Sequence, residues 1–399
     1  MDMSRSNRRT ARALIIGATA FVAALAQTGP LYASPRTVPS TPAPRPVQST
    51  DVARIMADSA ARRTIPLWSG AATHQGVTYP YQMVGKSPLV HQRNPRVIVD
   101  TPVVSVIWHF PDGTTSDPTK PTGCGASTSL SPRQLVAGSP VFTAHPYSSG
   151  GVFVGRGQYV DEFQRANLWR AIQSTANRSY SVRLRGSFSR VVDLTPAQTA
   201  LFKPVTDPYG HLPCGHLWGV DAFAVDNYLQ RTLIPSLHLR TDQFPIFLGS
   251  NIFGYVGQPG LFDVIGNHGS YIDAQALLQT YAEVDYDTTG FMAPDVSVLA
   301  HEVGEWMDNP LNDNHVPTIT GLGCQTTPPA GPNSLEVGDP LEYANVTVGP
   351  MPNGVTYHPQ DLAFASWFYD EVPSRASNPG WYSFNGTFRT DAAATPSCF

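Results

Sequence analysis

Apolar side chains recur along the chain with two different periods, and these periods predict alternating strands and helices. Residues 95–110 are rich in β-branched and aromatic side chains and predict one or two core strands, with an interruption at Pro102. Residues 159–174 repeat apolar positions near helical spacing and predict a helix. The same criteria predict strands at 180–186, 244–257 and 279–286, a helix at 220–237 and a loop at 264–271. This alternation indicates an α/β fold.

The stretch SVLAHEVGEWMDNP contains a predicted helix with an acidic polar face. Asp295 is a suitable N-cap, and Pro310 disfavours helical geometry at the residue before it, so we expect a helix of about 13 residues between them. At about 100° per residue, His301, Glu305 and Asp308 share one face. The opposite face is apolar and consists of Val296, Leu299, Val303, Trp306 and Met307. The simplest interpretation is an amphipathic helix whose polar side meets water.

The spacing within this helix also matches the chemistry of zinc peptidases. These enzymes place two ligands one helical turn apart, with a glutamate directly after the first ligand to activate the attacking water. His301 and Glu305 occupy the two ligand positions, and Glu302 occupies the position of the catalytic base. The resulting H-E-x-x-E pattern has a carboxylate in place of the usual second histidine. Zinc accepts carboxylate oxygen, although the added negative charge weakens its Lewis acidity.

A third metal ligand has to come from another part of the chain. The stretch NSLEVGDPLEY offers Glu336, Asp339 and Glu342, and its alternative role is a solvated turn. We favour Glu336 as the third ligand, with Asp339 as an alternative ligand or as a group that orients one. His268, in GNHGSY, is a candidate oxyanion donor rather than a ligand. The other histidines considered are weaker ligand candidates or structural residues: His109, His211, His216, His315 and His358.

Two other kinds of site are less consistent with the sequence. Oxygen-bearing side chains suited to calcium follow the helix, namely Asp308, Asn309, Asn312, Asp313 and Asn314. Their spacing lacks the glycine and the terminal glutamate of an EF-hand loop, so calcium is expected at most as a structural ion. A serine hydrolase is disfavoured because the sequence contains no G-x-S-x-G motif.

The N-terminal region predicts export. Four arginines among the first dozen residues precede an apolar run at 13–26, which is too short for a comfortable membrane span. We expect residues 1–33 to be a signal peptide and the mature protein to be extracellular or periplasmic, without stable membrane insertion; an uncleaved anchor is the alternative. Repeated prolines predict a linker at 34–62. Residues 63–399 are then expected to form one large, loop-rich domain.

Composition excludes some classes of protein and indicates an oxidising compartment. Hydrophobic residues make up 41% of the chain and charged residues 14%, which is typical of a globular protein. The net charge is -4, and no dense basic run follows the N-terminus, so the sequence lacks the basic patch that is typical of nucleic-acid-binding proteins. Four cysteines in an exported chain suit two disulfides. Of the three possible pairings, we prefer Cys124 with Cys214 and Cys324 with Cys398.

The motifs also resemble those of known proteins. VLAHEVGEWMDNP followed by LEVGDPL, together with the upstream GNHGSY and QTYAEVDYD, resembles a group of secreted bacterial proteins of metallopeptidase-like type. These stretches are also distantly similar to the plant phosphate-induced, EXORDIUM-like proteins, which often lack the histidine. The resemblance covers roughly residues 95–399. It implies a helix motif of His301, Glu302 and Glu305 and a downstream acidic motif of Glu336 and Asp339.

Two functional hypotheses follow from these patterns. The first is a secreted zinc-dependent hydrolase, a peptidase acting on peptide or protein substrates, with a zincin-like mixed sheet and an active-site helix. The second is a non-catalytic extracellular protein that uses the same scaffold to bind cell-wall glycans or another protein. The aromatic clusters SWFYDEV and NPGWYSFNG would supply the binding surface in that case.

Overall fold

The computed structural model describes most of the chain between residues 43 and 387. The described residues are 43–90, 94–122, 129–174, 179–195, 205–206, 217–256, 264–289, 293–317, 334–341, 344–372, 376 and 381–387. The expected signal peptide lies outside this part of the chain, as do both predicted disulfides.

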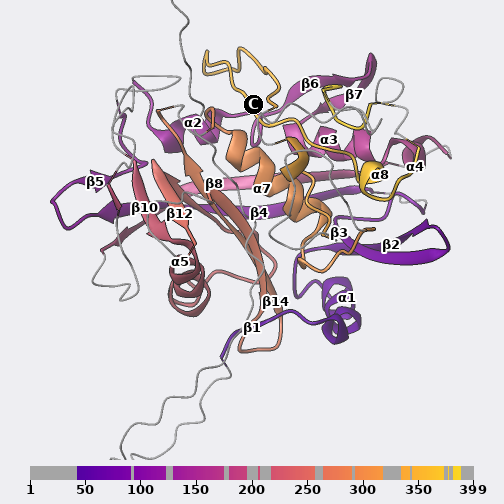
Figure 1. The fold of residues 1–399 in the computed structure, drawn as a ribbon, viewed down its shortest axis with the longest axis horizontal. Helices are drawn as coiled ribbons and strands as arrows, with labels where there is room; N and C mark the ends of the chain where they lie inside the picture. The colour runs from indigo at the N-terminus through magenta and orange to yellow at the C-terminus, as the bar shows by residue number, and fades with distance from the viewer. Residues whose placement is uncertain are drawn as a thin grey trace, which may run out of the picture.

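A seven-stranded mixed sheet forms the centre of the described fold (Figure 1). Its strands are β1 (Arg45–Pro46), β4 (Arg96–His109), β5 (Thr115–Ser116), β8 (Ser181–Leu194), β11 (Ile246–Ser250), β13 (Gly266–Ile272) and β14 (Leu278–Tyr286). Their order is β1-β13-β14-β11-β4-β5, with β8 also paired to β4. The strands β14, β11, β4 and β8 are parallel neighbours, whereas β13 runs antiparallel to β14. The central parallel strands are covered on both faces, which explains the long apolar runs in their sequences.

Smaller sheets and short helices surround the main sheet. The smaller sheets pair β10 (Trp218–Asp221) with β9 (Val205–Thr206) and β12 (Ile252–Tyr255), β2 (Leu67–His74) with β3 (Val77–Val84), and β6 (His145–Ser149) with β7 (Val152–Gly157). The α-helices are α1 (Val52–Ala60), α2 (Pro132–Gly138), α3 (Tyr159–Asn167), α4 (Trp169–Gln173), α5 (Ala222–Tyr228), α6 (Ile234–Ser236), α7 (Ser297–Asp308) and α8 (Ala365–Phe368). A π-helical turn, Leu229–Leu233, joins α5 to α6, and 3-10 turns occur at Ser49–Asp51 and Asp339–Leu341.

Helices α7 and α5 pack on opposite faces of the main sheet. Successive side chains of a strand point to opposite faces, and on β14 Ala282 and Val284 pack in the same apolar cluster as the residues of α7. Tyr281 belongs to a second cluster, and its hydroxyl donates to Asp226 of α5. In Figure 1, α7 lies near the centre, whereas α5 lies beside β10 and β12. The main sheet therefore has an apolar core on each side.

The structure confirms most of the predicted elements and corrects others. The mixed α/β class and the strands predicted at 95–110, 180–186 and 279–286 are confirmed. The stretch 244–257 forms two strands, β11 and β12, which belong to different sheets, and the helix predicted at 159–174 divides into α3 and α4. The predicted loop at 264–271 is wrong, because six of its eight residues belong to β13 and pair with β14.

The predicted linker at 34–62 is folded over much of its described part. Arg45 and Pro46 of β1 pair with Ile272 and Tyr271 of β13, and α1 follows. Ile55 of α1 is fully buried in the main core. A proline-rich composition disfavours internal hydrogen bonds but does not prevent a short edge pairing, so the segment docks on the domain from Arg45 onward.

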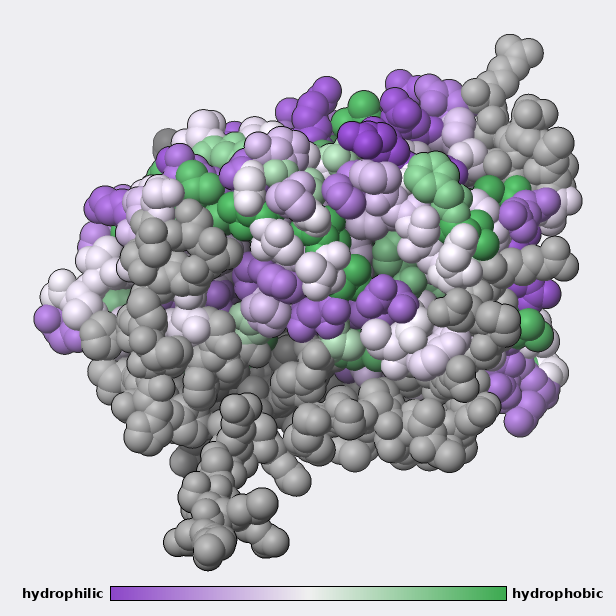
Figure 2. All heavy atoms as spheres, turned by 90° about the horizontal axis from the view of Figure 1, so that it is seen from above, coloured by the Kyte–Doolittle hydropathy of each residue, from purple (hydrophilic) through white to green (hydrophobic). Residues whose placement is uncertain are grey.

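The surface shows a mixture of polar and apolar residues. Seen from above, hydrophilic and hydrophobic side chains alternate over the described part of this face (Figure 2). Scattered exposed apolar side chains are ordinary for a folded protein. Among the described residues, no helix is both long enough and apolar enough to cross a membrane.

Candidate metal centre

Helix α7 is buried along its whole length, including its polar face. All twelve of its residues are buried, and Trp306 stacks on Phe244 with ring centroids 3.8 Å apart. The interpretation of a polar face in water is therefore wrong. The predicted N-cap is also wrong: Asp295 has a φ of 28° and precedes the N-cap residue Val296. Its carboxylate instead accepts hydrogen bonds from the backbone N–H groups of Val296 and His358.

One cluster of potential metal ligands forms around His301. The Nε2 atom of His301 lies 3.0 Å from Oε1 of Glu305, one helical turn away, and 3.5 Å from Oδ1 of Asp339. The potential ligand atoms of these three residues all lie within 4.8 Å of one another. The other ring nitrogen, Nδ1, is 3.1 Å from Oε1 of Gln360. Gln360 in turn donates to the carbonyl of Gly338, so the ring is held in one orientation.

A second cluster shares Glu305 and contains Glu336, together with a histidine that sequence analysis did not identify as a ligand. His268, Glu305 and Glu336 also have their potential ligand atoms within 4.8 Å of one another. Nδ1 of His268 lies 3.5 Å from Oε2 of Glu305. Oε1 of Glu336 accepts hydrogen bonds from Asn309 at 3.1 Å and Ser334 at 2.7 Å. Of the two predicted third ligands, Asp339 therefore groups with His301, and Glu336 groups with His268.

The register of β13 brings His268 to the helix. His268 pairs with Ala282 of β14, and Gly266 pairs with Val284, so both β13 residues share the face on which α7 packs. A Cβ at position 266 would lie 2.6 Å from Oε1 of Glu302 and would force that side chain to move. The close approach at Gly266 thus places β13 directly against the motif. The prediction of a loop at GNHGSY does not reveal that alternate side chains of this stretch face α7.

Glu302, the predicted catalytic base, lies beside His268 and lines a small pocket together with His301. Its Oε2 atom is 3.5 Å from Nδ1 of His268. The residues that line the pocket are Ile265, Ala293, Ser297, Val298, His301, Glu302 and Gln360. The pocket has no room for a water molecule. Glu302 therefore contacts the ligand cluster itself, next to a potential metal ligand, which is the position of a general base in a metal site.

Burial and mutual charge shift the pKa values of these groups strongly. Burial raises the pKa of Asp339 to about 7, and the negative charge of Glu305 adds to the effect. Burial also raises the pKa of Glu336 well above its usual range, again with a contribution from Glu305. Burial lowers the pKa of His301, but the charge of Glu305 and the hydrogen bond to Asp339 outweigh it, so this pKa lies well above 6.5. Clusters of perturbed groups of this kind are typical of functional sites.

The donor set fits a transition-metal ion. Imidazole nitrogen and carboxylate oxygen are both ordinary zinc ligands. Oδ2 of Asp339 is buried and has no hydrogen-bond partner among the described residues. Because an unpaired buried polar atom is costly, a cation at the cluster would stabilise groups that the protein alone leaves partly unsatisfied.

The remaining residues singled out from the sequence lie outside both clusters or outside the described chain. Asp308 is buried and accepts a hydrogen bond from Asn167 of α3. Among the calcium candidates, the Oδ1 atoms of Asn309 and Asn314 accept backbone N–H groups, which gives no support to a calcium site. The other histidines pair with single carboxylates away from α7 or at its start: His109 with Asp193, His315 with Asp313 and His358 with Asp295. Glu342, His211 and His216 are not among the described residues.

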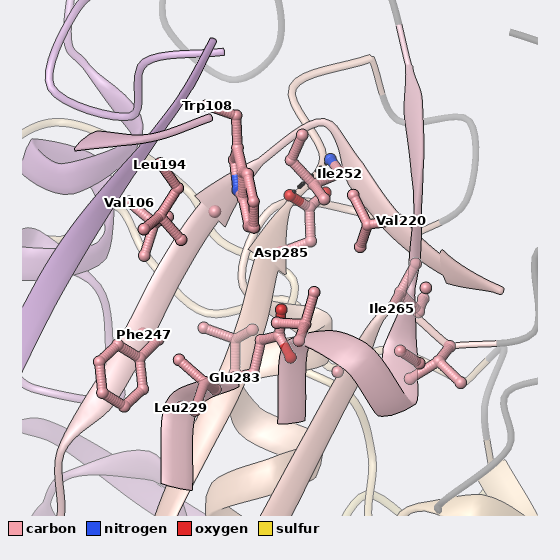
Figure 3. A pocket seen from close by; sticks show the side chains of 17 residues that line it. Val106, Trp108, Leu194, Val220, Leu229, Phe247, Ile252, Ile265, Glu283 and Asp285 are labelled. Atoms are coloured by element: carbon pink, nitrogen blue, oxygen red, sulfur yellow. Dashed lines mark hydrogen bonds between the residues drawn. The ribbon is translucent and has the colours of Figure 1, made fainter. Parts of the chain in front are cut away.

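An apolar pocket with two carboxyl groups lies at the other side of the sheet (Figure 3). Glu283 and Asp285 of β14 point between side chains such as Trp108 and Phe247, and they alternate with the residues that face α7. Oδ1 of Asp285 accepts the backbone N–H of Ile252 at 2.8 Å. Burial raises the pKa of Glu283 to about 8 and that of Asp285 well above its usual range. These groups belong to a different environment from the histidine clusters.

Comparisons of the chain with protein-family models, with curated proteins and with solved structures found no match.

Proposed function

We propose that the chain is a secreted zinc-dependent hydrolase that cleaves peptide bonds in peptide or protein substrates. The single observation that supports this most is the meeting of His301, Glu305 and Asp339 in one buried cluster, with Glu302 beside it. The H-E-x-x-E spacing, the N-terminal signal-like segment and the resemblance to secreted metallopeptidase-like proteins are consistent with it. A helix that bears the motif and packs on the antiparallel hairpin β13–β14 supports a zincin-like scaffold.

The roles of the residues follow from their positions. His301, Glu305 and Asp339 would hold the zinc ion, which supplies Lewis acidity toward a substrate carbonyl. Glu302 takes a proton from the attacking water and transfers it to the leaving amine. Gln360 fixes the ring orientation and tautomer of His301 through Nδ1.

The test is the substitution Glu302→Gln, which keeps the shape of the side chain and removes its basicity. We expect hydrolysis of a peptide library to fall by at least about 100-fold, the usual minimum for loss of a general base. Zinc content, measured by elemental analysis, should stay unchanged. A matched control is Glu371→Gln, the same chemical change at an exposed residue outside the centre, which should alter neither quantity.

Two outcomes would contradict the proposal in different ways. Loss of zinc together with activity in Glu302→Gln would make Glu302 a ligand or a structural residue. A wild-type protein that holds zinc and cleaves no peptide would favour the alternative, an extracellular binding protein for cell-wall glycans or another protein.

A further inference from the structure

We propose that the centre holds two divalent metal ions bridged by Glu305. The first ion is bound by His301 and Asp339, and the second by His268 and Glu336. This inference rests on the proposed hydrolase for the first ion and adds a second ion that the H-E-x-x-E motif does not imply.

The two oxygens of Glu305 face two different histidines. Oε1 lies 3.0 Å from Nε2 of His301, and Oε2 lies 3.5 Å from Nδ1 of His268. Each histidine has a further carboxylate in its own cluster, Asp339 for His301 and Glu336 for His268. A carboxylate with one oxygen in each of two ligand groups is suited to bridge the ions of a two-metal site, which lie about 3.5–4 Å apart.

The His301 cluster contains a buried polar atom that the protein leaves unpaired. Asp339 is 2% exposed and His268 is 4% exposed. Oδ2 of Asp339 has no hydrogen-bond partner among the described residues, and an ion beside His301 would satisfy it. A single ion in the His301 cluster would leave the buried side chains of His268 and Glu336 without a cation of their own, and burial of such polar groups without a partner is costly.

The charge of the centre also favours two ions, because metal binding displaces the protons that the buried carboxyl groups and imidazoles otherwise hold. Four carboxyl groups, those of Glu302, Glu305, Glu336 and Asp339, lie together with two imidazoles, and all six side chains are buried. With neutral imidazoles and ionised carboxylates, one divalent ion leaves two negative charges uncompensated in a low-dielectric interior. Two divalent ions neutralise the four carboxylates. No lysine or arginine makes an ion pair with these carboxylates within the described part of the chain.

The chemistry of the ligands limits the kind of metal. Each cluster offers one imidazole nitrogen and two carboxylates, a set that suits zinc, manganese or iron rather than copper(I) or calcium. Glu336 is already oriented by Asn309 and Ser334, which bond to the same oxygen, Oε1. Its second oxygen is therefore the one available to an ion.

The test is the stoichiometry of zinc in the full chain. After removal of metals with a chelator, the protein is titrated with zinc alone, and bound zinc is counted by elemental analysis. We expect two ions in the wild type and one in each of His268→Ala and His301→Ala. His109→Ala, on the surface and outside both clusters, serves as a matched control and should keep two. Circular dichroism confirms folding, and Glu336→Gln replaces His268→Ala if the latter does not fold.

The bridging role of Glu305 can be tested separately, by magnetic coupling between the two ions. With manganese alone, two ions joined by one carboxylate couple magnetically, and electron paramagnetic resonance detects this coupling. We expect coupling in the wild type and its loss in Glu305→Gln. Two bound ions without coupling would overturn the bridging role of Glu305.

The outcomes separate this inference from the proposed hydrolase. One zinc ion in the wild type, retained in His268→Ala, would overturn the second ion and leave the hydrolase intact. A folded wild type without zinc would overturn both. Two ions in a protein that cleaves no peptide would support the pair of ions and contradict the hydrolase.

Discussion

Gly338 is the position where a single added methyl group should disturb the candidate metal centre most directly. An ideal Cβ at Gly338 would lie 2.4 Å from Nδ1 of His301, 2.5 Å from Cγ and 2.7 Å from Cε1. Ordinary contacts of a Cβ atom begin at about 3.4 Å, so Gly338→Ala requires a displacement of about 1 Å. Every contacting atom belongs to the imidazole ring, and no flexible chain end can absorb the change.

The imidazole ring and the backbone at Gly338 are both held in place. Nδ1 of His301 bonds to Gln360, whereas the backbone N–H of Gly338 donates to Oε1 of Glu305 at 3.1 Å. Moving the ring therefore breaks its orienting bond, and moving the backbone shifts both Glu305 and the neighbouring Asp339. We expect a loss of about 1–3 kcal/mol in the free energy of unfolding, as for other overpacked sites. We also expect zinc affinity to fall by about 10–100-fold, as when an orienting partner of a ligand is removed.

The assay is competition for zinc with a chromophoric chelator, together with urea unfolding of the same samples. The control is Gly304→Ala in the middle of α7, where the new methyl group meets the end of the Leu362 side chain at 2.7 Å. Only the end of one side chain, away from His301 and Asp339, has to shift, and alanine favours the helix by up to about 1 kcal/mol. Zinc affinity should therefore not change. Wild-type zinc affinity in folded Gly338→Ala would refute the assigned position of His301.

Two further predictions concern stability. Burial, with the charges of Asp226 and Glu302, raises the pKa of Glu283 from 4.5 to about 8. Between these pH values the folded state keeps a proton on Glu283 that the unfolded chain has lost. As the pH rises from about 4.5 to 8, the wild type should therefore lose up to about 1.4 kcal/mol of stability per pH unit relative to Glu283→Gln. Urea unfolding of both proteins at pH 5 and pH 8 measures this, and an equal difference at the two pH values would contradict it. Trp306 is fully buried, stacks on Phe244 and donates a hydrogen bond to Thr280 at 3.1 Å. Trp306→Ala should therefore lower the free energy of unfolding, measured with urea, by about 3–5 kcal/mol. A loss below about 1 kcal/mol would show that this core is not packed as described.

Local patterns in the sequence were sufficient to predict the elements that depend on near neighbours. The period of the apolar residues predicted the helix that became α7 and the strands that became β4, β8 and β14, because these periods reflect which side of an element is buried. The H-E-x-x-E spacing likewise predicted that His301 and Glu305 lie one turn apart, a consequence of helical geometry alone.

Contacts between distant segments were decided only by the tertiary structure. Alternation along β13 could have indicated that His268 points to one face, but only the pairing with β14 shows that this face is the one that α7 covers. The division of Asp339 and Glu336 between two clusters depends on how the segment 334–341 returns to the helix, and no local period encodes that path. The burial of the polar face of α7 has the same origin: a carboxylate that would be solvated on an isolated helix is enclosed because β13, α3 and the C-terminal segments pack around it.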